Sequence, residues 1–288
     1  MKNKLDLIGR LLRVRQWIKN LFIFAPIVFA QKAFDGISVI KVLVAAALFC
    51  LLTSCVYILN DIEDMEKDVL HPIKKLRPIA SGEVSKKNAL ILVAILLPVS
   101  TVLGVFLEVN FGVVMILYFL NNYLYSRFLK HMVIVDVLSI AIGFVLRVIA
   151  GAEVIDIYVS PWILICTLFL ALFLGLNKRK NEMLILGSEA CKFRENLDEY
   201  SLEFIDNMLS AVIAMTLIAY SLYTFFSHND VYMMTSTIPV VIYGIFRYQY
   251  LVYRKNEGGS PEDTILSDRA LLATIAIWGL IVMLAIYF

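Results

Sequence analysis

Residues 39–60 form the apolar stretch VIKVLVAAALFCLLTSCVYILN, which runs directly into the acidic stretch DIEDMEKD at 61–68. A helix needs about 20 predominantly apolar residues to cross the hydrocarbon core of a bilayer. The first stretch has that length and one charged residue, Lys41, so it predicts a membrane-spanning helix. The second stretch predicts a group of carboxylates at the end of that helix.

The composition agrees with a protein that is dissolved in lipid. Of the 288 residues, 60% are hydrophobic and 17% are charged, and the mean hydropathy is +0.81. A soluble globular protein is about half apolar and a quarter charged, so a soluble globular domain is disfavoured. The four cysteines show no paired spacing, and we interpret them as packing residues.

Apolar runs of similar length recur along the chain and predict nine membrane-spanning helices. They lie at 17–34, 39–60, 89–107, 111–126, 132–152, 160–177, 208–227, 232–250 and 270–288. Only helices and closed barrels satisfy their backbone groups in lipid, and these runs are too long for barrel strands. We therefore expect an all-α polytopic bundle that forms one integral membrane domain over residues 1–288. No convincing cleavage site follows the basic N-terminus, so the first run is expected to be retained.

The basic residues predict the orientation of the bundle. With nine spans, all Lys and Arg residues except Lys32, Lys41 and Arg147 fall on the side of the N-terminus. Basic loops stay in the cytoplasm, so we expect a cytoplasmic N-terminus and a functional face toward the cytoplasm. The long polar loops at 61–88, 178–207 and 251–269 lie on that same side.

The acidic stretch is the strongest candidate site. If the helix continues through it, Asn60, Asp64 and Asp68 follow one another every four residues on one face, with Asp61 beside them. Mg²⁺ suits such a set, because it takes a few carboxylates and keeps its other positions for water and phosphate oxygens. A solvated acidic helix end is the simpler alternative.

A basic loop follows at 71–82, in which two prolines and Gly82 predict turns. Its residues Lys74 and Arg77 could neutralise phosphates that a metal also binds, although both could be ordinary cytoplasmic positive charges. A second basic element, at 178–182, ends the sixth span and contains Lys178, Arg179 and Glu182. It is typical of a phosphate site and also of a plain stop-transfer sequence.

Polar residues at membrane depth form a further group of candidates. Arg147 lies inside the fifth span, and a buried arginine either pairs with a structural partner or reaches an anionic ligand. Tyr125 and Lys130, near the end of the fourth span, could line a polar cavity, and interfacial anchoring is the alternative. Near the C-terminus, Ser260 is expected to cap a helix that begins at Pro261.

Together these residues resemble the UbiA-type membrane prenyltransferase superfamily, whose hallmark is N-D-x-x-D-x-x-x-D after the second of nine helices. Asn60, Asp61, Asp64 and Asp68 match this pattern in full, and residues 77–82 match the loop that follows it. Typical members have a second aspartate-rich element after span six, which the basic element at 178–182 replaces here. This difference resembles the decaprenyl-phosphate phosphoribosyltransferase branch, whose features also match residues 15–20, His71-Pro72, Gly151-Ala152, 160–162, Pro261-Glu262 and Asp268-Arg269.

The resemblance implies transfer of 5-phosphoribosyl from phosphoribosyl pyrophosphate (PRPP) to a polyprenyl phosphate in the plasma membrane. It implies that Asp61, Asp64 and Asp68, supported by Asn60, hold Mg²⁺ and act as the catalytic set. Contacts to PRPP are implied for Lys74, Arg77, Lys178 and Arg179, with Glu182 in the same element. Lys19 and Arg147 become candidates for the lipid phosphate, with Tyr125 and Lys130 lining the substrate cavity.

Two other functions remain open at this point. An ordinary UbiA-type enzyme would move a prenyl group from a prenyl diphosphate to an aromatic acceptor with the same first motif. A transporter or channel would distribute charge across the bilayer, which the one-sided charge disfavours. The loop at 178–207 is the candidate lid over the site. Among partners, a homo-oligomer is left open and no nucleic acid is expected.

Overall fold

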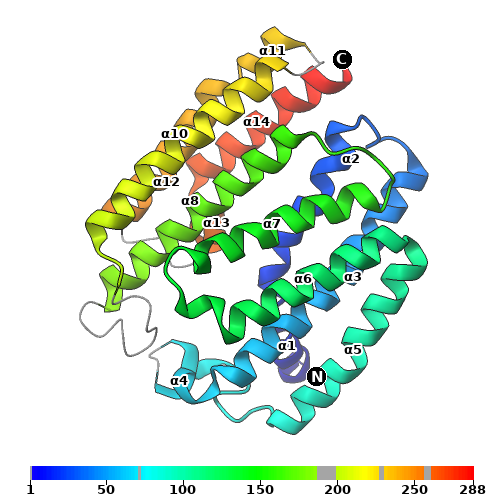
Figure 1. Ribbon diagram of the computed structural model, residues 1–288, viewed down its shortest axis with the longest axis vertical. Coiled ribbons are helices and arrows are strands. Elements are labelled where there is room, and N and C mark those ends of the chain that lie inside the picture. Colours follow the sequence, from blue (N-terminus) through cyan, green and yellow to red (C-terminus); the bar gives the residue numbers. More distant parts are fainter. Residues whose placement is uncertain (1, 71–72, 187–198, 227–229, 256–260) are drawn as a thin grey trace. The chain divides into compact units, whose positions relative to one another are not determined.

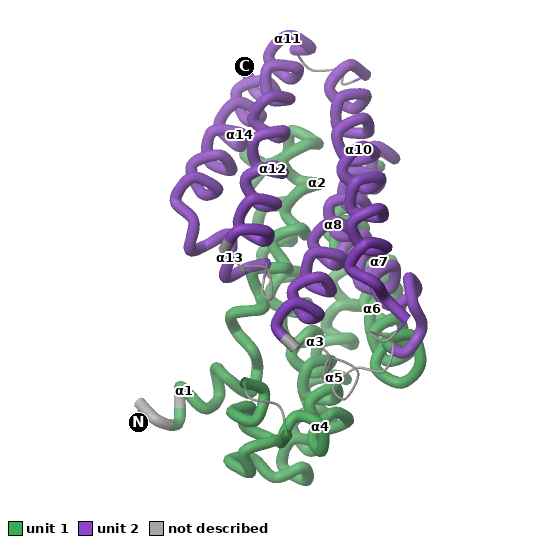
Figure 2. The backbone as a smooth tube through the Cα atoms, turned by 90° about the vertical axis from the view of Figure 1, so that its left-hand side faces the viewer, with its two compact units in different colours: residues 1–130, 146–158 green, residues 131–145, 159–288 purple. Residues whose placement is uncertain are grey.

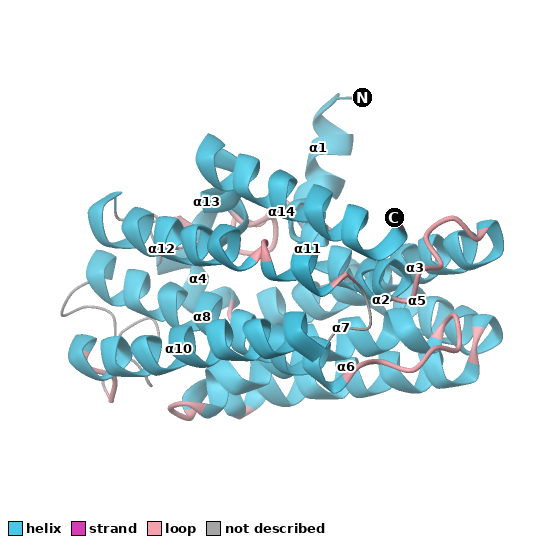
Figure 3. Cartoon of the chain, turned by 90° about the horizontal axis from the view of Figure 1, so that it is seen from above, coloured by secondary structure: helices cyan, strands magenta, loops and turns pink. Residues whose placement is uncertain are grey.

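A computed structural model describes residues 2–70, 73–186, 199–226, 230–255 and 261–288. Within these ranges every regular element is helical (Figures 1 and 3), which confirms the all-α prediction. The longer helices are α1 (Lys2–Leu11), α3 (Gly36–Glu63), α5 (Lys86–Leu107), α6 (Val109–Arg127), α7 (Val135–Glu153), α8 (Pro161–Leu186), α10 (Leu202–Phe226), α12 (Ile238–Lys255) and α14 (Arg269–Tyr287). The 3₁₀ helices and the remaining α-helices are η1 (Val14–Phe24), α2 (Ala25–Phe29), α4 (Met65–Leu70), η2 (Lys74–Leu76), η3 (Leu129–His131), α11 (Val231–Thr235) and α13 (Pro261–Ser267).

Six of the described helices are long and apolar enough to cross a membrane, which makes the chain an integral membrane protein. They are α3, α5, α7, α8, α10 and α14, and each coincides with one of the predicted spans. The other three predicted spans are also helical, but none of them is a single helix that is both long and apolar enough to cross a membrane. The run at 17–34 divides into η1 and α2, the run at 232–250 divides into α11 and α12, and α6 carries asparagines that lower its hydropathy. The count of nine spans and the orientation therefore stay predictions.

The chain folds as two compact units, which are coloured separately in Figure 2. Unit 1 comprises residues 1–130 and 146–158, and unit 2 comprises residues 131–145 and 159–288. In unit 1, α3 packs against α5, α6 and η1, and in unit 2, α10 packs against α8 and α12 packs against α14. The prediction of one functional domain stays open.

The core of unit 1 forms around α3, because α3 buries apolar side chains on several faces. Phe49 and Leu52 are fully buried there against Phe111 and Met115 of α6. The ring of Phe49 lies 4.7 Å from that of Tyr118, measured between centroids. Burial of this kind holds the middle of α3 rigid, so the polar residues at its C-terminal end stand on a fixed base.

The first part of the segment at 178–207 is helical, because α8 continues through the basic element to Leu186. The side chain of Arg179 binds Glu182 one turn later at 2.6 Å, and such pairs support a helix. Residues 187–198, the middle of the candidate lid at 178–207, lie outside the described residues, as do His71-Pro72 and Ser260. The helix predicted from Pro261 is confirmed as α13.

Gly151 gives the first testable prediction. A Cβ atom at this position of α7 would lie 2.0 Å from the carbonyl oxygen of Ile23 and 2.8 Å from its carbonyl carbon. Because both atoms belong to the backbone of η1, a side chain has no room and the segment must shift. We expect Gly151→Ala to destabilise the protein by about 1–3 kcal/mol, as overpacking does, in unfolding measurements in mixed micelles.

Gly279→Ala in α14 is the matched control, since nothing lies within 4 Å of the added Cβ. It should leave the stability unchanged or raise it slightly, because alanine favours helix more than glycine does. Equal stability of Gly151→Ala and the wild type would contradict the close approach of η1 to α7.

Candidate active site

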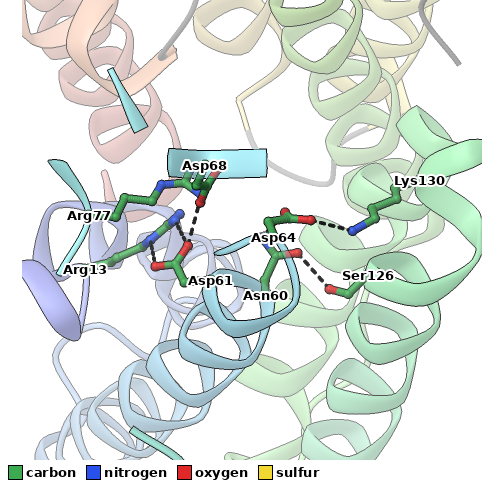
Figure 4. A network of polar contacts seen from close by, with 8 residues as sticks. All are labelled: Arg13, Asn60, Asp61, Asp64, Asp68, Arg77, Ser126 and Lys130. Atoms are coloured by element: carbon green, nitrogen blue, oxygen red, sulfur yellow. Dashed lines mark hydrogen bonds and ion pairs between the residues drawn. The ribbon is translucent and has the colours of Figure 1, made fainter. Parts of the chain in front are cut away.

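The junction between α3 and α4 positions the four residues of the acidic motif. Helix α3 ends at Glu63, and Asp64 follows with φ −87° and ψ 2° before α4 begins at Met65. The predicted continuous helix is therefore interrupted at Asp64, and the expectation that all four residues share one face is wrong. Asp61 and Asp68 lie on one side of the junction, while Asn60 and Asp64 turn toward the end of α6 (Figure 4).

Asp61 is buried, and two arginines bind its carboxylate. Arg13 donates to both oxygens, from Nε to Oδ2 at 3.2 Å and from Nη2 to Oδ1. Arg77 donates from Nη1 to Oδ1 at 3.0 Å. Hydrogen bonds between charged groups are stronger than neutral ones, so this carboxylate is held in place by the two guanidinium groups.

Asp68 shares the guanidinium of Arg77, whose Nη1 also donates to its Oδ2 at 2.5 Å. This contact ties Arg77, in the loop that follows α4, back to α4 itself. Gly82, at φ +78°, turns the chain back toward α5, as its position in the sequence predicted. Burial raises the pKa of the Asp68 carboxyl above its usual value, and the positive charges of Arg77 and Lys74 oppose this effect.

Asp64 and Asn60 form the other half of the site with the end of α6. Lys130 donates to Asp64 at 2.7 Å, and Asn60 donates to the other oxygen of Asp64 at 3.2 Å. The hydroxyl of Ser126 donates to Asn60 at 3.0 Å. Three carboxylates thus face three cationic side chains, and all of these residues belong to unit 1.

The donor set of this site fits a divalent cation by its chemistry. Carboxylates and a carboxamide offer the oxygen ligands that Mg²⁺ prefers, and each carboxylate already binds a positive charge. Among the residues that the structure describes, no three acidic, histidine or cysteine side chains converge on one point. Metal binding there would therefore require the cationic side chains to yield carboxylate oxygens, and the predicted metal role of these residues stays a prediction.

Arg147, on α7, lies in a second polar cluster of unit 1, and its guanidinium lies over the ring of Phe49 in the middle of α3. Its Nε donates to Asn20 at 2.9 Å and its Nη2 donates to the hydroxyl of Tyr118 at 2.7 Å. All three side chains are buried, so the structural pairing that the sequence left open is present. Lys19, on η1 beside Asn20, binds Gln16 at 2.5 Å.

The residues from the second basic element belong to unit 2. Arg179 is 1% exposed and donates to the fully buried carboxylate of Asp136 at 2.8 Å. The hydroxyl of Tyr200 donates to the same carboxylate at 2.9 Å, and burial together with the Asp136 charge raises the pKa of Tyr200. Lys178 is half-buried on α8, and in unit 1 Tyr125 is half-buried on α6.

Sequence reasoning missed Arg13, which it counted only among the cytoplasmic positive charges. A signal was available, since Arg13 and Arg15 stand two residues apart directly before the Gln16-Trp17 element. Nothing in that spacing identifies Asp61 as the partner, because 48 positions separate the two residues. Ser126 was likewise missed as a partner of Asn60.

Fold and site together define an all-helical polytopic membrane protein with a charge-paired acidic site at the end of a spanning helix. The chain belongs to the UbiA prenyltransferase family, whose model matches residues 21–181. It is therefore an enzyme of the transferase class.

Relatives and solved structures agree with this assignment. The chain is 32% identical to decaprenyl-phosphate phosphoribosyltransferase of Mycolicibacterium smegmatis, over 100% of this chain and 94% of the relative. It is also 32% identical to the enzyme of that name from Corynebacterium glutamicum, over 99% of this chain and 88% of the relative. A UbiA homologue from Archaeoglobus fulgidus bound to DMAPP and Mg²⁺ has the same fold, with a TM-score of 0.76, 18% identity, and coverage of 96% of this chain and 98% of that one.

Proposed function

We propose that the protein transfers 5-phosphoribosyl from PRPP to a polyprenyl phosphate and releases diphosphate. The observation that carries this proposal is the full-length similarity to two enzymes named for that reaction. The charge pattern supports it, because basic residues replace the second aspartate-rich element of ordinary family members. PRPP carries a 5-phosphate in addition to its diphosphate, and a basic second element suits that extra charge.

The acidic motif supplies the residues for binding the diphosphate. Asp61, Asp64 and Asp68, with Asn60, would hold Mg²⁺, which when bound neutralises negative charge on the departing diphosphate. The arginine and lysine side chains beside these carboxylates, Arg77 and Lys130, would orient the phosphates. Lys74 acts on Asp68 electrostatically and is the further candidate for a phosphate contact in this loop.

The reaction itself needs little covalent help from the protein. A phosphate oxygen of the lipid attacks C1 of the ribose, and the bond between C1 and the diphosphate oxygen breaks, with its electron pair leaving on diphosphate. Positive charge develops at the ribose and negative charge at the leaving group. Positioned positive groups stabilise that separation, and positioning removes the entropic cost of bringing two substrates together.

The remaining candidates are assigned by depth and charge. Lys19 and Arg147 would approach the lipid phosphate, and Tyr125 would line the substrate cavity. Lys178 and Arg179, with Glu182, would serve the 5-phosphate of PRPP, although the burial of Arg179 on Asp136 also suits a purely structural role. The positive-inside pattern supports an active site that faces the cytoplasm from the plasma membrane.

Transfer of labelled phosphoribosyl tests the proposal directly. We expect purified protein with labelled PRPP, Mg²⁺ and a polyprenyl phosphate to move label into the organic phase. Asp64→Ala should abolish this transfer, because it removes a predicted metal ligand and the partner of Lys130. The measurement is the label extracted per unit time, with chelator as the control for metal dependence.

A different result of this experiment would favour the ordinary prenyl transfer of the family. If PRPP gives no transfer and a prenyl diphosphate is consumed with an aromatic acceptor, the protein is a prenyltransferase and the role of the basic element is wrong. The observation that favours this second candidate is that a solved structure of the same fold is bound to DMAPP.

A further inference from the structure

Arg13 binds the acidic site, although it precedes the part of the chain that the family model matches. That match begins at residue 21, whereas Arg13 stands between α1 and η1. Its guanidinium contacts both oxygens of the buried Asp61 carboxylate and lies over the ring of Tyr57, 5.0 Å from the centroid. The Arg13 guanidinium therefore neutralises the Asp61 carboxylate, and the ring of Tyr57 stabilises the guanidinium further through a cation–π contact.

The guanidinium of Arg13 and a metal ion compete for the same atoms. A divalent cation on Asp61 needs at least one of the two carboxylate oxygens, and Arg13 donates to both of them. A diphosphate offers what Arg13 would lose, because a guanidinium binds phosphate oxygens with the same two-pronged geometry. Arrival of a metal–diphosphate pair therefore allows an exchange in which no charge is left without a partner.

The backbone around Arg13 is suited to such a movement. Arg13 has φ 51° and ψ 48°, the left-handed conformation that is uncommon for a residue with a side chain and that concentrates at functional sites. The 3₁₀ helix that follows spans 11 residues, whereas runs of more than about four are uncommon because 3₁₀ hydrogen bonds have poorer geometry than those of an α-helix. The side chain of Arg13 is also 19% exposed, compared with 4% for Asp61, so it has a path outward.

We propose that Arg13 is a phosphate-binding residue that exchanges Asp61 for the diphosphate when a divalent cation binds the acidic motif. This inference rests on the proposed function only in requiring a diphosphate-bearing donor. It assigns Arg13 a dual effect: the side chain opposes binding of metal alone and favours binding of diphosphate.

Two binding measurements on the purified protein test the exchange. The affinity for Mn²⁺ alone is measured by the electron paramagnetic resonance of free Mn²⁺, and the affinity for labelled pyrophosphate is measured by equilibrium dialysis at saturating Mn²⁺. We expect Arg13→Gln to bind Mn²⁺ about tenfold more tightly and pyrophosphate about tenfold more weakly, since each change corresponds to about one charged hydrogen bond. Changes of opposite sign are the signature, because a merely structural role would weaken both affinities.

Arg10→Gln is the matched control. Arg10 precedes Arg13 by less than one helical turn and also holds a carboxylate, with Nη1 and Nη2 3.0 and 2.5 Å from Glu83, but that carboxylate is outside the acidic motif. The control removes the same charge and should leave both affinities at the wild-type values. Arg13→Lys, which keeps the charge and loses the fork, should lose less pyrophosphate affinity than Arg13→Gln and guards against a folding defect.

Each outcome separates this exchange from the proposed function. An unchanged or weaker Mn²⁺ affinity in Arg13→Gln, or an unchanged pyrophosphate affinity, overturns the exchange even if the enzyme transfers phosphoribosyl. Failure of the wild type to bind Mn²⁺ also overturns it. Changes of opposite sign support it even if PRPP proves to be the wrong donor, since pyrophosphate represents any diphosphate.

Discussion

Asp61→Asn is expected to lower the rate of phosphoribosyl transfer by about 10²–10³-fold, the usual loss when one preorganised electrostatic group is removed from an active site. Asparagine keeps the size of the side chain and removes its charge. Asp61 is the carboxylate on which Arg13 and Arg77 meet, so its neutralisation weakens metal binding and releases both arginines together. The measurement is the label transferred from PRPP to lipid at saturating substrates and several Mg²⁺ concentrations.

Glu63→Gln, two residues further along α3, is the matched control for this prediction. Glu63 is partly exposed and pairs only loosely with Arg127, at 3.5 Å. An ion pair of this kind contributes little in water, so transfer should continue at the wild-type rate. Equal losses in both variants would mean that the general negative charge of the helix end matters and that Asp61 has no special role.

Asp136→Leu is expected to cost about 3–5 kcal/mol of the free energy of unfolding, the range for breaking a buried ion pair. Asp136 and Arg179 are 0% and 1% exposed, and the substitution leaves the guanidinium in the interior of unit 2 with Glu182 as its remaining acidic partner. Tyr200 loses its acceptor at the same time. Unfolding by SDS in mixed micelles gives the free energy.

The double variant Asp136→Leu with Arg179→Met separates structure from substrate binding at this pair. Replacing both charges by apolar groups is often nearly neutral, so the double variant should recover most of the lost stability. If it also retains transfer, Arg179 serves the fold, and if it is stable but inactive, Arg179 serves the substrate as proposed. Recovery of no stability would contradict the direct pairing of the two residues.

The exposed pair between Arg10 and Glu83 offers a contrast with the buried one. Glu83→Gln should leave the unfolding midpoint at the wild-type value, because solvent screens this pair. The Arg10 guanidinium and Ser81 lower the pKa of Glu83. Any stabilisation from the pair is therefore present above the ordinary pKa of glutamate and is lost as the pH falls through the lowered value.

The amino-acid sequence alone determined the properties that depend on local composition and spacing. Runs of apolar residues predicted helices in lipid, and six of them are present as helices long enough to span, because a bilayer selects for length and hydropathy, which are read directly along the chain. The acidic motif at 60–68 and the basic loop with Arg77 were identified by the same means. The family followed from those motifs.

Only the tertiary structure decided which charges meet. The interruption at Asp64 divides the carboxylates that the spacing had placed on one face, and it does so because α3 ends one residue earlier. Arg13 reaches Asp61 across 48 positions and Lys130 reaches Asp64 across 66. An ion pair forms where two chain segments approach within a few ångströms. The packing of the helices determines that approach, and the residue pattern within one segment does not reveal it.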